Sequence, residues 1–329
     1  MTNPSRSAAS STDKTEGPLA GHRHAFRFTD HSSWGAIHRL RTGPPPSQSG
    51  PEMEAWIHTL HVAVYEDQIA VAIDRLLRQH TGTNRRWLAI EGPSLLGKSS
   101  AITAVLLDRA MAHPQWRTQS PEGRQQTPYI YLASQTNQTS KAYLVAIARA
   151  CGLPADGDEH RLHNRLSELL LAHGVELIVV DDGHFCRRIS DQASRLSDGL
   201  RALLDLPVPI VVVGIDLSRS AWLRDPGRNN DSAQQLRRRA NRLVLLPLHR
   251  DRGPKPADLF AALLRHLQRI EGFHAPGLNP ETMFWLTTRL EGLTGSMLEA
   301  VKTAAVEAIW DNGRALTKDH LYAAVGDFA

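Results

Sequence analysis

The sequence predicts an α/β fold in which a parallel five-stranded sheet is flanked by helices and followed by a small C-terminal helical lid. Between residues 85 and 250, short runs rich in β-branched residues alternate with amphipathic helical segments. This alternation is typical of a parallel sheet covered on both faces. From residue 255 onward only helical segments follow. A third observation is the stretch EGPSLLGKSS at residues 91–100, which places glycines between an apolar run and a helical pattern.

The chain begins with a segment rich in Ser, Pro, Gly and Thr over residues 1–51. This composition predicts a flexible, disordered tail, with a short anchoring piece at residues 32–43. Residues 52–80 then carry apolar side chains at helical spacing, interrupted near Tyr65. The expected domains are a tail at 1–51, an α/β nucleotide-binding domain at 52–254 and a helical lid at 255–329.

Apolar, β-branched runs predict the strands at residues 85–92, 127–134, 175–182 and 208–216, with a further strand-like run at 241–250. Helical periodicity predicts the helices around the sheet at residues 97–113, 140–152, 158–174 and 189–206. The helices of the lid are expected at residues 257–272, 279–292, 296–313 and 317–326. Each lid helix ends near Gly or begins near Asp, Ser or Thr, as helix caps do.

Composition limits the classes of protein to be considered. The chain carries 38 Lys and Arg against 34 Asp and Glu, a net charge of +4 that is compatible with a polyanionic partner without requiring one. No run of 18 apolar residues occurs, and the N-terminal residues lack the apolar segment of a signal peptide. We therefore expect no membrane partner and a cytoplasmic location, where Cys151 and Cys186 stay reduced. The 16 histidines are scattered without the spacing of metal ligands, which favours ordinary histidines.

The stretch from Gly92 to Ser99 fits the phosphate-loop pattern G-x-x-x-x-G-K-[ST], with a predicted strand before it and a predicted helix after it. Glycines let the backbone bend closely around phosphate groups, where N–H groups and a helix N-terminus meet negative charge. Lys98 is expected to reach the β- and γ-phosphates, and the Ser99 hydroxyl to bind Mg²⁺. The predicted nucleotide contacts in this loop are Gly92, Pro93, Ser94, Leu95, Leu96, Gly97, Lys98, Ser99 and Ser100.

Two acidic residues end the predicted strand at residues 175–182. Asp181 is expected to hold Mg²⁺ through water, and Asp182 stands where a glutamate usually orients the attacking water. Because aspartate is one methylene shorter, its carboxylate would lie roughly 1.5 Å further from that water. Misplacement by about an ångström costs around a hundredfold in rate. The pair therefore predicts nucleotide hydrolysis that is slow.

The order of these motifs resembles the TniB/TnsC group of AAA+ transposition ATPases over about residues 52–325. The resemblance is carried by LAIEGPSLLGKSS, by the ARACGLP segment, by Asp181–His184 after the acidic strand, and by QLRRRANRL near the last strand. It implies an AAA+ core with a lid and ATP and Mg²⁺ as cofactors. It also implies self-assembly as a ring or helical filament on double-stranded DNA. The implied role is to couple target-site selection to a transposase, with the transposase and a target-selection protein as partners.

The resemblance assigns roles only where residues match. Asp216, shortly after the fourth strand, is the candidate for the sensor-1 position of the nucleotide site. Arg239, with Arg238 in reserve, is the candidate arginine finger presented to a neighbouring subunit. A solvent-exposed basic face remains the alternative for this arginine run. The segment GLTGSMLEAV lacks the sensor-2 arginine of many AAA+ proteins, so the lid is expected to contact nucleotide poorly.

DNA binding by such an assembly would follow the phosphate backbone with little base readout. The candidate contacts are Lys141, after the second strand, and Arg187 and Arg188, after the acidic pair. Two other classes of function remain open from the sequence: a P-loop kinase acting on a metabolite, and a nucleotide switch in signalling. ATPase activity stimulated by DNA separates the transposition regulator from both alternatives.

Overall fold

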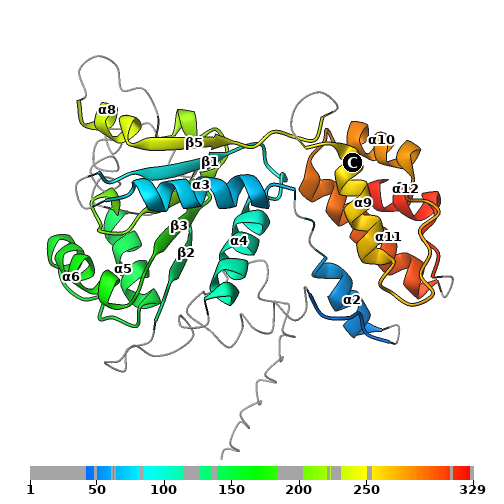
Figure 1. Ribbon diagram of the computed structural model, residues 1–329, viewed down its shortest axis with the longest axis horizontal. Coiled ribbons are helices and arrows are strands. Elements are labelled where there is room, and N and C mark those ends of the chain that lie inside the picture. Colours follow the sequence, from blue (N-terminus) through cyan, green and yellow to red (C-terminus); the bar gives the residue numbers. More distant parts are fainter. Residues whose placement is uncertain are drawn as a thin grey trace, which may run out of the picture.

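The computed structural model describes residues 42–47, 50–60, 62, 64–81, 84–113, 126–134, 139–183, 203–220, 223, 231–249, 254–311 and 314–326. Five parallel strands form one sheet in the order β2-β3-β4-β1-β5 (Figure 1). The strands are β1 (Trp87–Glu91), β2 (Tyr129–Ala133), β3 (Leu177–Asp181), β4 (Ile210–Gly214) and β5 (Ala240–Val244). Each lies within a run predicted from the sequence, except that β5 begins one residue earlier, so the parallel five-stranded sheet is confirmed.

The central strands are buried along their whole length, which explains why they appear in the sequence as continuous apolar runs. Alternate residues of a strand point to opposite faces of the sheet. In β1, Leu88 and Ile90 pack in one cluster with α3 (Glu66–Gln79) and α4 (Lys98–Ala112). Trp87 and Ala89 pack in another cluster, with the apolar faces of α5 (Ser140–Ala150) and α6 (Glu159–Ala172).

Local capping explains where the two helices on the second face begin. The Thr139 side chain accepts from the Ala142 amide at the start of α5 (3.2 Å). The Asp158 carboxylate accepts from the Arg161 amide at the start of α6 (2.8 Å). Such caps satisfy amides that have no partner inside a helix. Two shorter helices, η4 (Leu217–Arg219) and α8 (Asp231–Arg238), follow β4 and precede β5.

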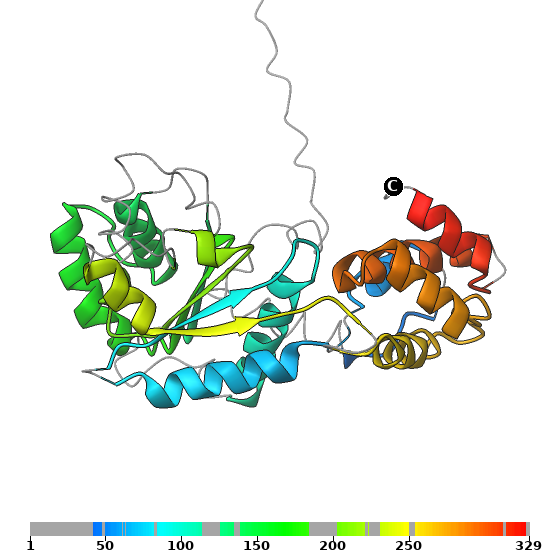
Figure 2. The same ribbon diagram turned by 90° about the horizontal axis from the view of Figure 1, so that it is seen from above.

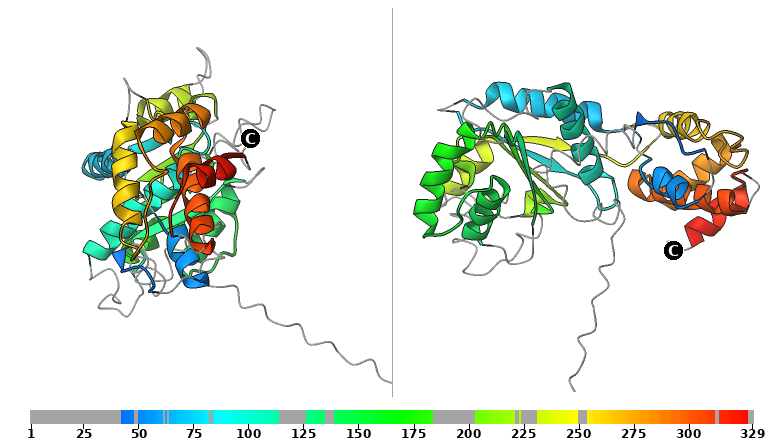
Figure 3. Two further views of the ribbon diagram at one scale, coloured as in Figure 1. Left: turned by 90° about the vertical axis from the view of Figure 1, so that its right-hand side faces the viewer. Right: turned by 90° about the horizontal axis from the view of Figure 1, so that it is seen from below.

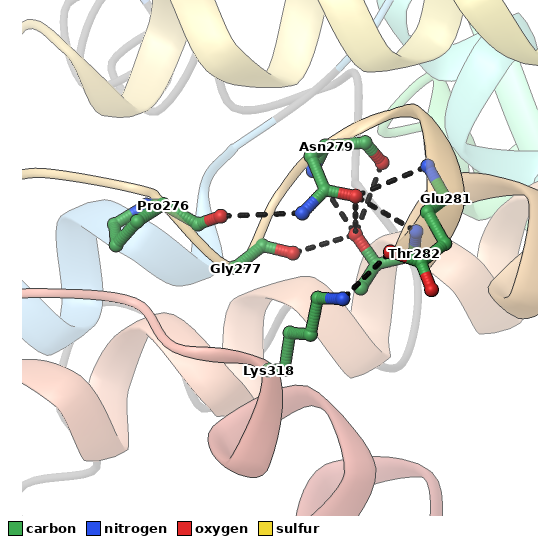
Figure 4. Close-up of polar contacts among 6 residues, drawn as sticks. All are labelled: Pro276, Gly277, Asn279, Glu281, Thr282 and Lys318. Carbon is green, nitrogen blue, oxygen red and sulfur yellow. Dashed lines mark hydrogen bonds and ion pairs between the residues drawn. The ribbon is translucent and has the colours of Figure 1, made fainter.

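Four helices form the C-terminal lid: α9 (Pro256–Leu267), α10 (Pro280–Arg289), α11 (Thr294–Trp310) and α12 (Lys318–Gly326). They overlap the four predicted lid segments. Asn279 and Thr282 form a reciprocal capping box at the start of α10, in which Asn279 also accepts from the Glu281 amide (Figure 4). Lys318, the first residue of α12, pairs with Glu281 at 2.7 Å and ties the two helices together.

Helix α2 (Pro51–His58) packs with the lid and not with the sheet (Figures 2 and 3). Its buried Met53, Trp56 and Ile57 belong to the same apolar cluster as residues of α9, α10, α11 and α12. The sequence pattern places residues 52–80 together in the α/β domain. Helical periodicity identifies a buried face but not the surface that it covers, so it could not separate α2 from α3. The expected boundaries at residues 52, 254 and 255 stay predictions.

Residues 42–47, expected to be part of the tail, lie near α9: the Arg269 guanidinium donates to the Thr42 carbonyl at 3.2 Å and also to that of Gly43. Residues 1–41, and with them most of the expected tail and anchoring piece, lie outside the described residues. In the portion of the chain that the structure describes, every helix is too short or too polar to cross a membrane.

Candidate nucleotide-binding site

The candidate site lies at the edge of the sheet where the strands reach their carboxyl ends. β1 leads into the phosphate loop, β3 ends at Asp181, and β4, which lies between them, leads to Asp216. In open parallel sheets this edge is where ligands bind. The sheet therefore brings the phosphate loop together with acidic residues that are far from it in the chain.

Close backbone approaches explain the glycines of the phosphate loop. A Cβ on Gly92 would lie 2.7 Å from the Leu245 carbonyl oxygen and 2.9 Å from a Leu96 methyl carbon. Gly97 has φ of 79°, in the left-handed region, directly before α4 begins at Lys98. Leu95 is also left-handed, with φ of 58°, and its side chain is 65% exposed. The loop thus curves tightly before the amides at the N-terminus of α4.

Lys98 is held inside this loop. Its side chain is only 8% exposed, and its ammonium donates to the carbonyl oxygens of Gly92, at 3.1 Å, and Pro93. Burial lowers the pKa of Lys98, while the nearby carboxylates of Asp181 and Asp182 act in the opposite direction. The ammonium therefore lies between the loop carbonyls and the acidic pair, close to where phosphate groups would meet the loop amides.

Asp181 is buried and both of its carboxylate oxygens accept hydrogen bonds. One accepts from the Asp182 amide at 2.8 Å, and the other accepts from the Tyr131 hydroxyl. The Ser99 and Thr103 hydroxyls of α4 also act on Tyr131 and lower its pKa. Burial and the Asp181 charge raise the pKa of Tyr131 well above its usual value, so the phenol stays protonated as a donor.

Tyr131 was missed from the sequence. In YIYLA it alternates with apolar residues, as core aromatic residues of a strand do. No local signal in the sequence distinguishes it, because its place depends on strand register: Ala133 pairs with Asp181, so Tyr131 lies two residues before that pair on the same face.

These residues fit a magnesium ion. Ser99 and Asp181 supply the hard oxygen atoms that Mg²⁺ prefers, and both lie against the Tyr131 hydroxyl. Within the described ranges, no group of three or more His, Cys, Asp or Glu side chains could hold a metal. Mg²⁺ does not need such a group, because it is commonly held by one or two carboxylates together with phosphate oxygens and water.

Asp182 is half-buried and has φ of 55°, a left-handed conformation that Asp and Asn adopt more readily than other residues with a side chain. A Cβ on the next residue, Gly183, would lie 2.4 Å from a Val212 methyl carbon. The chain therefore turns sharply after β3 and leaves Asp182 beside the loop, within electrostatic reach of Lys98.

Asp216 lies after β4 with its side chain exposed and φ of 46°, and its carbonyl begins η4 by accepting from the Arg219 amide at 2.9 Å. A further acidic residue at this edge, Glu91, was not singled out from the sequence. It is 7% exposed, accepts from the Ser218 amide at 3.2 Å and forms an ion pair with Arg242 of β5. Glu91 thus links the end of β1 to η4 and to β5.

The two candidate finger residues lie at the other end of the sheet. The Arg239 carbonyl accepts from the amide of Trp87, the first residue of β1, at 3.3 Å, and the Arg238 carbonyl accepts from the Arg86 side chain at 3.0 Å. Five strand residues at about 3.3 Å each separate this end from the phosphate loop by roughly 16 Å. These arginines are therefore not placed to contact a nucleotide in their own subunit.

Among the candidate DNA contacts, Lys141 is exposed in the first turn of α5, at the carboxyl edge of the sheet. Arg187 and Arg188 lie outside the described residues, as does His184. The described structure thus places one of the three candidates.

The lid reaches the phosphate loop through the first turn of α11. The Gly295 amide donates to the Leu95 carbonyl oxygen at 2.9 Å. The neighbouring Thr294 hydroxyl lies 3.1 Å from the Tyr65 hydroxyl, which donates to the Leu246 carbonyl at 2.7 Å. The lid was expected to contact nucleotide poorly because it lacks an arginine here. The structure shows that its contact with the loop itself is made by the backbone.

Comparison with known proteins agrees with this geometry. Residues 80–218 match the family model described as an AAA domain. The Aeropyrum pernix ORC1 protein, solved in complex with DNA, superposes with a TM-score of 0.54 at 19% identity, covering 84% of this chain and 68% of that chain. The Aeropyrum pernix ORC2 protein in its ADP form gives a TM-score of 0.54 at 15% identity, covering 88% of this chain and 72% of that chain. No curated protein matches the sequence.

The sheet order, the phosphate loop after β1 and the acidic end of β3 agree with the family match. At these identities the two solved structures establish a shared fold and no more. Residues 80–218 match an AAA domain, and the chain shares its fold with these two solved structures.

Proposed function

We propose that this chain is an ATPase that assembles on duplex DNA when it binds ATP, and that it regulates transposition as the TniB/TnsC group does. The observation that carries the nucleotide part is the convergence of Lys98, Ser99 and Asp181 at one edge of the sheet. The transposition part rests on the resemblance of the motifs. The similar fold of an ORC1 protein solved with DNA supports a test with duplex DNA.

In this proposal the phosphate loop binds the triphosphate through its amides, and Lys98 exchanges its loop carbonyls for phosphate oxygens. Bound Mg²⁺, held by Ser99 and Asp181, would neutralise charge on the phosphates. Asp182 would orient water, and Asp216 would contact the phosphates from β4. Arg239 of a neighbouring copy would complete the site, which is consistent with its distance from the loop of its own subunit.

We also propose a domain division that follows the buried clusters. The α/β domain runs from about residue 64 to residue 245, and residues 51–62 join residues 248–325 in the lid. The core and lid would then close on the nucleotide from two sides, because the Gly295–Leu95 contact lies between them.

Nucleotide binding and DNA response test the proposal together. We expect the wild-type chain to bind a fluorescent ATP analogue with Mg²⁺ and Lys98→Ala to lose that binding. We further expect duplex DNA to raise the ATPase rate and the particle size seen by light scattering or electron microscopy. If DNA changes neither rate nor particle size while ATP and Mg²⁺ are present, the DNA-assembly part is wrong.

One observation favours a second candidate, a nucleotide switch whose binding to protein partners matters more than turnover. Asp182 replaces the usual glutamate, and a slow enzyme keeps its nucleotide for longer. Tight ATP binding with negligible turnover, both in the presence and in the absence of DNA, would support the switch over the DNA-stimulated ATPase.

A further inference from the structure

Tyr131 lies between the two halves of the candidate magnesium site. β2 and β3 are parallel neighbours, with Tyr131 paired to Val179 and Ala133 paired to Asp181. Residues in register on parallel strands share a face, so Tyr131 is a diagonal neighbour of Asp181 on the face that α4 covers. A tyrosine side chain can span such a diagonal, and its hydroxyl donates to the Asp181 carboxylate.

The same hydroxyl meets α4. Ser99 and Thr103 are four residues apart and therefore lie one above the other on the helix surface. Both of their hydroxyls act on the Tyr131 hydroxyl and lower its pKa, against the larger effects of burial and the Asp181 charge. A single phenolic oxygen thus connects the residue that ends β3 with the first turn of the helix after the phosphate loop.

The number of hydroxyl protons determines which of these groups donates and which accepts. A tyrosine hydroxyl has one proton to donate and two lone pairs that accept. Because the Tyr131 proton goes to Asp181, its oxygen is left as an acceptor for the Ser99 and Thr103 hydroxyls that act on it. A serine that binds a metal through its oxygen lone pair keeps its own proton, and that proton needs an acceptor. Tyr131 is the acceptor that this chain provides.

We propose that Tyr131 is a positioning residue of the magnesium site, which holds the Ser99 hydroxyl and the Asp181 carboxylate in the orientation that one Mg²⁺ ion requires. The inference rests on the proposed nucleotide function and deepens it. In this account Tyr131 raises the affinity of the nucleotide complex for Mg²⁺ and leaves the affinity for nucleotide without Mg²⁺ unchanged. Tyr131 makes no direct metal contact in this account.

The experiment is a magnesium titration on the full chain. A fluorescent ATP analogue is bound to wild type and Tyr131→Phe, first in EDTA and then with increasing Mg²⁺. Groups that orient metal ligands typically contribute about 10- to 100-fold to metal affinity. We therefore expect Tyr131→Phe to need about 10-fold or more Mg²⁺ for the half-maximal effect, with the affinity in EDTA unchanged.

Tyr129→Phe is the matched control, because it removes a second buried hydroxyl from the same strand and face. Its hydroxyl interacts with Arg109 and Glu176 at the opposite end of β2, away from the loop. This control should titrate as wild type does. An unchanged midpoint for Tyr131→Phe overturns the inference. An equal loss of affinity in EDTA and in Mg²⁺ also overturns it, because that pattern indicates a general structural role.

A second pair of variants gives an independent readout. If Tyr131 acts through Ser99, then Tyr131→Phe should shift the Mg²⁺ midpoint much less in a Ser99→Ala background, and full additivity contradicts the inference. Should Tyr131→Phe not fold, Thr103→Val serves instead, with a smaller shift expected and no shift counting against the inference. Failure of wild type to bind the analogue at all identifies a failure of the proposed function itself.

Discussion

The backbone amide of Gly295, in the first turn of α11, donates a 2.9 Å hydrogen bond to the carbonyl oxygen of Leu95 in the phosphate loop. A Cβ added to Gly295 would lie 2.5 Å from that oxygen and 3.3 Å from the Gly97 amide nitrogen. Helix and loop therefore touch through backbone atoms, with no flexible side chain between them. Movement of the loop and movement of α11 are linked at this point.

Gly295→Ala should disturb both partners of that contact. Overpacking of this kind costs about 1–3 kcal/mol, and 1.4 kcal/mol corresponds to about tenfold in an equilibrium constant. We expect nucleotide affinity to fall by about tenfold, measured by binding of a fluorescent ATP analogue. Gly326→Ala is the control, because a Cβ there meets nothing within 4 Å. If Gly295→Ala binds nucleotide and unfolds as Gly326→Ala does, the contact between Gly295 and Leu95 has room for a methyl group and the prediction is wrong.

Asp182→Glu should raise the rate of ATP hydrolysis. The added methylene moves the carboxylate about 1.5 Å toward the water that it would orient, a displacement that can change the rate by around a hundredfold. Left-handed backbone at this position suits glutamate less well than aspartate, so some stability should be lost. Turnover under saturating ATP and the midpoint of thermal unfolding separate the two effects. No gain in turnover in a folded variant would remove Asp182 from its proposed role.

Arg239→Ala should leave nucleotide binding intact and lower turnover, because the residue lies at the far end of the sheet from its own loop. Its ion pair with Asp205 is 3.8 Å long and partly exposed, so its loss should cost at most about 1 kcal/mol of stability. Mixing Arg239→Ala with Lys98→Ala protein should restore part of the activity if the finger acts between subunits. Arg238→Ala tests the reserve candidate for the finger in the same way. A mixture without recovery would contradict the assignment.

Lys141→Ala should weaken DNA binding similarly for all sequences, since a lysine contact to phosphate carries no base information. One lost phosphate contact should lower the slope of log affinity against log salt by about one. Fluorescence anisotropy of a labelled duplex at several salt concentrations measures this slope. Lys302→Ala, in α11 and paired with Glu299, is a lysine control. Equal slopes for wild type and Lys141→Ala would exclude Lys141 from the interface.

The lid should lose stability in mild acid because of His266. The ring stacks on Trp56 at 4.8 Å, and burial, with a smaller effect of Arg269, lowers the pKa of His266 to about 4. The unfolded chain binds this proton near pH 6.5, so between about pH 6.5 and 4 the unfolded state holds more protons. The free energy of unfolding must therefore fall as the pH falls through that window.

His266→Phe keeps an aromatic ring against Trp56 and removes the titration. Thermal unfolding should show a smaller decrease of the midpoint between pH 7 and 5 in this variant, a difference of a few degrees at about 2–4 °C per kcal/mol. Parallel curves for the variant and the wild type would mean that other groups dominate the acid response.

The strands and the phosphate loop could be predicted because their signals are local. Strands β3 and β4 are runs of β-branched residues, β1 and β2 are runs of mostly apolar residues, and Gly97 and Lys98 stand at fixed spacing from Gly92. The neighbours of Asp181 could not be predicted, because strand order and register, and not spacing in the chain, bring Tyr131 to it. Glu91 was missed for the same reason, since its partners come from η4 and β5.

Helix α2 shows the other limit of local signals. Its apolar face was visible in the sequence, but a periodic face fits any complementary surface. Only the tertiary structure shows that Trp56 and Ile57 lie among the helices of the lid. The contact of α11 with the phosphate loop could not be predicted from the sequence either, because it is made by backbone atoms and requires no particular pattern of side chains.

Because α2 belongs to the lid, the polypeptide crosses between the two lobes twice, once after α2 and once after β5. Two covalent connections therefore hold the lid to the α/β domain. Any protein that pulls on the residues before Pro51 would therefore act on the lid directly, without passing through the sheet. A force on the residues before Pro51 would in this way reach the nucleotide site through the lid.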